Sequence, residues 1–285
     1  MILCQLSVEV NLGKNEIERV YNLRHKEVKM MKIKARILLF IFTICYFSAG
    51  SVSWAKETIV FKSSDGVHIT ADVYMKYKDK KTPFIAIFHQ AHWSRGEYLE
   101  IAPKLNQLGF NCMAVDLRSG KEVNRVANET MSRAKEMGKK TTYIDAMQDI
   151  EATLTYARNH YAQGKVIAWG SSYSAALVLK VAGDKPELVD GVLAFAPGEY
   201  FKRLGKPADW IQNSAKNIQI PAFITSARKE KRAWSDIFNV IPSEKKASYL
   251  PGTKGNHGSR ALWNRFKDSE GYWKAVTNFL TKNFK

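Results

Sequence analysis

The chain has 285 residues, of which 45% are hydrophobic and 12% aromatic, which is enough for one large domain with a sizeable core. Its 44 Lys and Arg residues outnumber 27 Asp and Glu residues for a net charge of +17, yet the bases are scattered among acids. This pattern indicates a solvated basic surface and argues against nucleic-acid binding. The absence of a repeat or a low-complexity tract in the sequence excludes the repeat and fibrous classes.

The pattern of the N-terminal part indicates a targeting segment. A short positive run at 31–36 precedes an uncharged apolar run at 37–47, and residues 48–55 are rich in small side chains. Ser53 and Ala55 stand at the −3 and −1 places of a cleavage site. These are the three regions of a bacterial secretory signal peptide. We therefore expect 1–55 to comprise an N-terminal extension plus signal peptide, and 56–285 to form a periplasmic or secreted domain.

Two alternatives remain open at this end of the chain. The apolar run has 11 residues, which is too short to span a bilayer unaided, so we expect no stable membrane insertion after cleavage. A permanent N-terminal anchor is the alternative. Translation could start at Met1, Met30 or Met31.

Cys112 is the one cysteine after residue 55, so the mature domain is predicted to form no internal disulfide.

The first half of the expected domain begins with strands. Residues 57–61 and 68–74 flank a turn that ends in Asp-Gly, which predicts a β-hairpin. The continuous apolar run at 84–88 is typical of a strand buried on both faces of a parallel sheet. Apolar residues at helical spacing follow over 98–108, and 110–115 is the next strand.

The second half continues the alternation of strands and helices. A long polar loop is expected over 121–142, followed by a helix over 143–157. An irregular stretch is expected after residue 201, as far as residue 219. Further strands are predicted at 166–169, 189–196, 222–225 and 247–250, and a last helix is predicted at 272–280. This order predicts an α/β fold, with a doubly wound, mostly parallel sheet flanked by helices and an antiparallel N-terminal hairpin.

The stretch Gly170-Ser-Ser-Tyr-Ser174 joins an apolar strand to an apolar helix. A serine at the apex of a strand–turn–helix unit is the arrangement of a nucleophile elbow. Gly170 supplies one of the small residues that the tight turn needs, and Ser174 stands where G-x-S-x-G has its second glycine. This register makes Ser172, and not Ser171, the candidate nucleophile. A plain serine-rich turn is the alternative.

The candidate base and acid follow the elbow in the chain. His257 lies in the glycine-rich loop 252–258, and it is the histidine that follows Ser172 in the C-terminal part. Triads of this type run in the order Ser, acid, His. Glu230, after the predicted strand 222–225, is the favoured acid that would orient the imidazole. Asp236 and Glu199 are the alternatives.

An acyl-transfer site also needs two backbone N–H groups for the oxyanion. Tyr173, directly after the candidate nucleophile, would supply one, and either Gln90 or Ala91 would supply the other. His89 and His92 have the spacing H-x-x-H, but no carboxylate or third ligand accompanies them in the sequence. We therefore expect no metal and no cofactor.

The motifs FHQAHWSRGEY, AVDLRSG, GSSYS and GNHG together resemble the dienelactone hydrolase-like branch of the α/β hydrolases. The resemblance covers most of 84–257 and implies the α/β-hydrolase fold. Dienelactone hydrolases proper use a cysteine nucleophile, whereas this chain has Ser172, and Glu230 replaces the commoner Asp. The inference that this chain shares with the branch is therefore serine ester hydrolysis.

These features predict an exported serine hydrolase, a carboxylesterase that cleaves small or medium acyl esters through an acyl-enzyme. Its expected partner is a small-molecule ester, with no nucleic acid. A serine peptidase or acyltransferase on the same triad is one alternative, and a catalytically inactive, hydrolase-like binding protein is another. The natural substrate and the oligomeric state are not specified by the sequence.

Overall fold

A computed structural model describes residues 13, 18–19, 23–32, 34 and 56–285 of the chain. Residues 23–32 are helical and exposed. Most of the predicted signal peptide, including the expected cleavage position after Ala55, lies outside the described residues. Among the residues that are described, no helix is both long enough and apolar enough to cross a membrane.

An eight-stranded sheet forms the centre of the domain 56–285, with the strand order β1-β2-β4-β3-β7-β8-β9-β10. The hairpin partners β1 and β2 are antiparallel, β2 pairs antiparallel with β4, and all other pairs are parallel. The strands are β1 (Lys56–Lys62), β2 (His68–Tyr74), β3 (Phe84–Phe88), β4 (Asn111–Val115), β7 (Val166–Ser171), β8 (Gly191–Phe195), β9 (Ala222–Thr225) and β10 (Lys246–Tyr249). The predicted fold class is confirmed.

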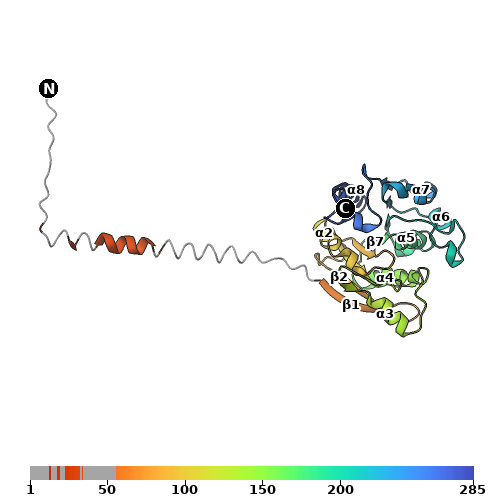
Figure 1. Cartoon of the computed structure of the whole chain (residues 1–285), viewed down its shortest axis with the longest axis horizontal. Helices are drawn as coiled ribbons and strands as arrows, with labels where there is room; N and C mark the ends of the chain where they lie inside the picture. Colours follow the sequence, from red (N-terminus) through yellow and green to blue (C-terminus); the bar gives the residue numbers. More distant parts are fainter. Residues whose placement is uncertain (1–12, 14–17, 20–22, 33, 35–55) are drawn as a thin grey trace, which may run out of the picture. The chain divides into compact units, whose positions relative to one another are not determined.

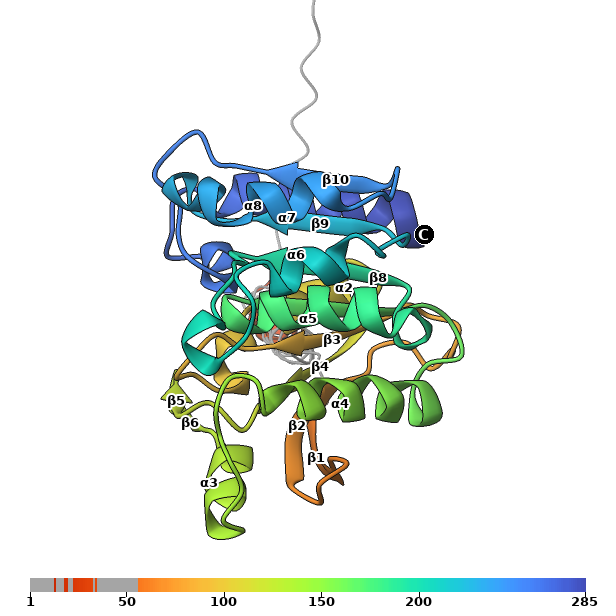
Figure 2. The same cartoon turned by 90° about the vertical axis from the view of Figure 1, so that its right-hand side faces the viewer.

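Helices cover both faces of this sheet. Figure 2 looks onto the face covered by α4 (Ala146–His160), α5 (Tyr173–Asp184), α6 (Trp210–Ala215) and α7 (Lys231–Val240). The opposite face packs against α2 (Ile101–Gln107) and α8 (Ser269–Phe284). Alternate residues of each central strand enter the two cores, as Ala168 and Trp169 of β7 do. The central strands are therefore mostly apolar, with polar residues such as Asn111 and Ser171 at their ends, because neither face meets water.

The region 121–142 differs from the expected polar loop. It contains the small hairpin β5 (Glu122–Val123) and β6 (Val126–Ala127), followed by the helix α3 (Glu129–Glu136). The side chain of Asn128 caps α3 by accepting a hydrogen bond from the Met131 N–H at 2.8 Å. The buried residues of α3 are Thr130 and Ala134, so the helix has no apolar stripe that the sequence could reveal.

Two further helices were absent from the expected elements. The short helix α6 lies in the stretch that we expected to be irregular, and α7 begins directly after Glu230. The buried side of α7 consists of Trp234 and Ile237, which follow the charged run 228–232. The helical spacing of Trp234, Ile237 and Ile241 was present in the sequence, but this stretch was interpreted only as a charged run after a strand.

A buried ion network joins the hairpin to the rest of the sheet. Arg118, which follows β4, donates hydrogen bonds to both carboxylate oxygens of Asp149 on α4 and to the carboxylate of Asp65 in the β1–β2 turn. The guanidinium of Arg118 holds the pKa of Asp65 well below its usual range. Figure 1 shows β1, β2 and α3 at one end of this domain and α7 and α8 at the other. The network thus fixes the hairpin end of the fold to the loop after β4.

Candidate active site

The elbow is built where β7 passes into α5. Ser172 stands between them with φ 60° and ψ −119°, a conformation that a non-glycine residue rarely adopts. A Cβ atom on Gly170 would lie 2.4 Å from the carbonyl oxygen of Ser174, so glycine is required there. Ser174, in the place of the second glycine, accepts a hydrogen bond from the Ser171 N–H at 2.8 Å. Its hydroxyl group therefore stabilises the turn by a side-chain hydrogen bond that a glycine at this position could not make.

The structure brings three of the predicted side chains together. The Nε2 atom of His257 lies 2.8 Å from the Oγ atom of Ser172, and its Nδ1 atom lies 2.7 Å from the Oε1 atom of Glu230. A carboxylate can only accept, so Nδ1–H donates to Glu230 and Nε2 accepts from the Ser172 hydroxyl. His257 and Glu230 are each about one-third exposed, with fractions of 32% and 31%. This chain of hydrogen bonds can carry the Ser172 proton to the imidazole.

Glu230 reaches His257 from the 3-10 turn η4 (Arg228–Glu230). Its second carboxylate oxygen accepts a hydrogen bond from the Ala227 N–H at 3.1 Å, and the Glu230 N–H donates to the Ala227 carbonyl at 3.0 Å. The turn therefore fixes both the backbone and the carboxylate of Glu230. A helical turn accommodates the extra methylene that distinguishes Glu from the commoner Asp.

The two alternative acids have other surroundings. Glu199 accepts hydrogen bonds from the backbone N–H groups of Ile211 and Gln212, and so caps the start of α6. Burial raises the pKa of Glu199. Asp236 lies exposed on α7. Of the three candidates, Glu230 is the carboxylate hydrogen-bonded to His257.

This geometry can be compared with known proteins. The family model described as serine aminopeptidase, S33, matches residues 79–218. A dienelactone hydrolase from Anabaena variabilis is 12% identical with a TM-score of 0.63, over 81% of this chain and 99% of its own. The chain has the α/β-hydrolase fold. The esterase Pf2001 of Pyrococcus furiosus is likewise similar in fold, at 15% identity and a TM-score of 0.62, over 82% of this chain and 94% of its own.

The fold is shared with peptidases as well as esterases. The dipeptidyl peptidase 4 of Porphyromonas gingivalis is 13% identical with a TM-score of 0.57, and the alignment covers 80% of this chain but 35% of that one. No curated protein sequence matches the chain. At these identities the solved structures establish the α/β-hydrolase fold alone.

In the loop after β3, one of the two N–H groups considered as oxyanion donors is already hydrogen-bonded. The backbone N–H of Gln90 donates to the Oε2 atom of Glu97 at 2.8 Å, so it is not available to a substrate. Within the described part of the chain, the N–H groups of Ala91 and Tyr173 have no hydrogen-bond partner. The sequence left the N–H groups of Gln90 and Ala91 as alternative oxyanion donors, and the hydrogen bond to Glu97 leaves Ala91 as the candidate.

His89 and His92 are not paired for metal binding. His89 is fully buried, its Nδ1–H donates to the Gln90 carbonyl at 2.8 Å, and its Nε2 accepts from the Leu117 N–H at 2.9 Å. Burial lowers the pKa of His89 to about 4, so the ring is neutral. His92 is exposed on the surface of the domain. The described residues include no group of three or more side chains suited to hold a metal ion.

Sequence reasoning missed Glu97, which is completely buried behind the elbow. Besides the Gln90 N–H, its carboxylate accepts the hydroxyl hydrogen of Ser171 at 2.7 Å. A signal was present: Glu97 precedes Ile101 and Leu105 at intervals of four, so it continues the buried stripe of α2. A charged residue on such a stripe marks a buried polar site.

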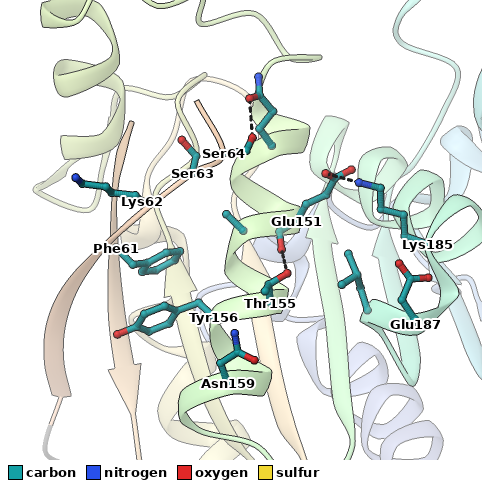
Figure 3. A pocket seen from close by; sticks show the side chains of 13 residues that line it. Phe61, Lys62, Ser63, Ser64, Glu151, Thr155, Tyr156, Asn159, Lys185 and Glu187 are labelled. Atoms are coloured by element: carbon teal, nitrogen blue, oxygen red, sulfur yellow. Dashed lines mark hydrogen bonds and ion pairs between the residues drawn. The ribbon is translucent and has the colours of Figure 1, made fainter. Parts of the chain in front are cut away.

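A separate pocket of about 580 Å³ lies between the hairpin, α4 and the segment 185–188. Figure 3 shows Phe61 and Tyr156 side by side in it, and their rings stack at 4.4 Å. Glu151 and Lys185 form an ion pair at 2.7 Å across the same pocket. It shares no lining residue with the site around Ser172.

Proposed function

We propose that the protein is an exported serine hydrolase that cleaves carboxylic esters of small or medium acyl groups. The observation that carries this proposal is the hydrogen-bonded chain Glu230–His257–Ser172, with distances of 2.7 and 2.8 Å, at a strained elbow. A serine next to a base that is itself oriented by a carboxylate is the arrangement of an activated nucleophile. This chain argues against an inactive binding protein.

In the proposed reaction, His257 removes the Ser172 proton while Oγ attacks the ester carbonyl carbon. The backbone N–H groups of Tyr173 and Ala91 stabilise the oxyanion, and Glu230 stabilises the imidazolium. The imidazolium then returns the proton to the leaving alcohol as its C–O bond breaks, which leaves an acyl-enzyme. Water, deprotonated by His257, hydrolyses the acyl-enzyme and restores the Ser172 hydroxyl group. No cofactor takes part in these steps.

A serine peptidase is the second candidate. The match of residues 79–218 to the serine aminopeptidase model favours it, as does the fold likeness to a dipeptidyl peptidase. The two candidates share the nucleophile and the base, and differ in whether the leaving group is an alcohol or an amine. Specificity for esters thus depends on the substrate pocket rather than on the triad.

Fluorophosphonate labelling and a substrate panel test the proposal together. We expect labelling at Ser172, hydrolysis of p-nitrophenyl acetate and butyrate, and little hydrolysis of aminoacyl or dipeptidyl nitroanilides. Rapid nitroanilide hydrolysis would establish the peptidase instead. Absence of labelling and of all hydrolysis by folded protein would refute a serine hydrolase.

Export is proposed on the strength of the charged, apolar and small-residue regions before residue 56. Mass spectrometry of the protein recovered from the periplasm or medium of a bacterial host should give an N-terminus at Lys56. Recovery of uncleaved chain from the cytosol would contradict this part of the proposal.

A further inference from the structure

Glu97 occupies a position where three separate segments of the hydrolase meet. It lies on the 3-10 turn η1 (Arg95–Tyr98), and its side chain is fully buried. One carboxylate oxygen accepts from the Gln90 N–H of the loop after β3 at 2.8 Å. The other accepts from the hydroxyl of Ser171, the residue before Ser172, at 2.7 Å. The carboxylate therefore bridges the loop that offers the Ala91 N–H and the strand that ends in the elbow.

The third segment follows His257 directly. The hydroxyl oxygen of Ser171 accepts a hydrogen bond from the Ser259 N–H at 2.8 Å, and the Trp263 indole N–H donates to the Glu97 carbonyl at 2.9 Å. The backbone N–H of Arg260 also stabilises the Glu97 carboxylate. Through these contacts, the segment 259–263 is fixed to Ser171 and to both the main-chain carbonyl and the carboxylate of Glu97.

The packing around this junction leaves no room for adjustment. Gly258, next to His257, has φ +69°, and a Cβ atom there would lie 2.5 Å from Ser171 Oγ and 2.7 Å from Gln90 Oε1. The His257 loop is thus in direct contact with both residues that hydrogen-bond to Glu97. A change in the position of either residue would move the loop that carries the imidazole.

The groups that face Glu97 are mostly neutral. Tyr98 on its own turn and Tyr173 on α5 are buried phenols, and His89 in the neighbouring loop is neutral. Arg260, on the turn η5 (Ser259–Leu262), is the cation whose charge lowers the pKa of Glu97. Burial outweighs this attraction and the hydrogen bonds, and raises the pKa of Glu97 to about 7.

We infer that Glu97 is a positioning residue, whose carboxylate holds the oxyanion loop and the His257 loop against the elbow in their reactive arrangement. The inference rests on the proposed function, because it concerns the geometry of the same site. Glu97 does not touch the substrate in this scheme. It acts through Gln90, Ser171 and Ser259, and only its ionised form can accept both hydrogen bonds without also donating one.

Glu97→Gln is the main test. The amide nitrogen can only donate, so it leaves either the Gln90 N–H or the Ser171 hydroxyl without an acceptor. Because displaced oxyanion donors affect the transition state rather than ground-state binding, we expect kcat on p-nitrophenyl butyrate to fall about 10- to 100-fold with KM changed less than about 3-fold. Glu100→Gln removes a charge from the adjacent surface and serves as the matched control, with wild-type kinetics expected.

The pH profile separates positioning from a merely structural role. Activity requires a neutral His257 and an ionised Glu97, so the acid limb of log kcat/KM in the wild type should approach a slope of about 2. In Glu97→Gln the slope should fall to about 1, because one titrating group remains. In Ser171→Ala the carboxylate loses a hydrogen bond that lowers its pKa, so the limb should move to higher pH, with a several-fold loss of kcat.

The outcomes distinguish this inference from the proposed function. If wild-type protein is neither labelled by fluorophosphonate nor active on esters, the proposed function fails, and the inference fails with it. If the wild type is active and folded Glu97→Gln retains the kcat and the acid-limb slope of wild type, the inference alone is overturned. If Glu97→Gln does not fold, an unshifted acid limb in Ser171→Ala overturns it.

Discussion

Two glutamates lie on opposite sides of Ser172, and their surroundings differ in almost every respect. Glu230 is 31% exposed and hydrogen-bonded to an imidazole, whereas Glu97 is fully buried and hydrogen-bonded to an amide and a hydroxyl group. The open side contains the groups that would exchange protons with substrate and water. The buried side contains the groups that fix the backbone. In the proposed hydrolytic site, Glu230 would serve proton transfer and Glu97 would serve positioning.

Replacement of the proposed nucleophile should have the largest effect, because both sides of the site act on it. We expect Ser172→Ala to lower kcat by about 10³-fold or more with the fold intact, since the members of a triad act as a unit. Ser171→Ala, one residue earlier on the buried side, should cost far less. Steady-state kinetics with circular dichroism would check this, and equal losses in both variants would show that the register is wrong.

Glu230→Gln tests the open side. The amide keeps the shape of the side chain but cannot stabilise the imidazolium, so we expect kcat to fall about 10²-fold. Asp236→Asn and Glu199→Gln are the controls and should stay within a few-fold of wild type in ester hydrolysis. A severe loss in one of these controls, together with a mild loss in Glu230→Gln, would assign the acid to that other residue.

The buried carboxylate of Glu97 should make the free energy of unfolding depend on pH. Burial raises the pKa of Glu97 from 4.5 to about 7, so the folded state holds a proton that the unfolded chain has already lost. The free energy of unfolding therefore falls as pH rises from about 4.5 to about 7, by an amount on the order of 3 kcal/mol. Urea unfolding at pH 5 and pH 8 should show a smaller difference in Glu97→Gln than in wild type. A difference as large as that of wild type would show that Glu97 titrates normally.

A substitution where the two sides touch should have a smaller effect on turnover than replacement of Ser172 or Glu230. Gly258→Ala places a Cβ atom against Ser171 and Gln90 and imposes a positive φ on alanine, so we expect kcat to fall about 10-fold and stability to fall by about 1–3 kcal/mol. Gly252 lies in the same loop, where an added Cβ atom would have nothing within 4 Å, which makes Gly252→Ala the matched control. Calorimetry and ester hydrolysis would measure both, and equal behaviour of the two variants would contradict the close contact.

The sequence predicted the parts of the fold that depend on local pattern. Continuous apolar runs such as 84–88 marked the central strands, and the elbow was recognisable because its serine, its small neighbours and its flanking strand and helix are contiguous. The order of Ser172, Glu230 and His257 along the chain allowed them to be proposed as one site. The helix α3 was not predicted, because its buried residues are Thr130 and Ala134 and these form no apolar stripe in the sequence.

Long-range hydrogen bonding could not be predicted in the same way. The stripe of α2 could indicate that Glu97 is buried, but it could not indicate that the Glu97 carboxylate accepts the Gln90 N–H, which is the contact that decides between Gln90 and Ala91. The contact from Ser259 to Ser171 spans 88 positions. Such contacts are fixed only when the sheet and its loops are assembled, and so the buried carboxylate was found from the structure.

The indole of Trp263 has a consequence for observing this protein. Its N–H donates to the carbonyl of Glu97 at 2.9 Å, and its ring is stacked on Trp93 with centroids 5.3 Å apart. Indole emission changes wavelength with the electric field at the ring, so a charge that appears on Glu97 should alter the fluorescence of this pair. We therefore expect the Trp93–Trp263 pair to report the ionisation state of Glu97, and Trp263→Phe would identify its signal among the seven tryptophans of the chain. Rapid-mixing fluorescence could follow the proton on the buried side without label, inhibitor or substrate.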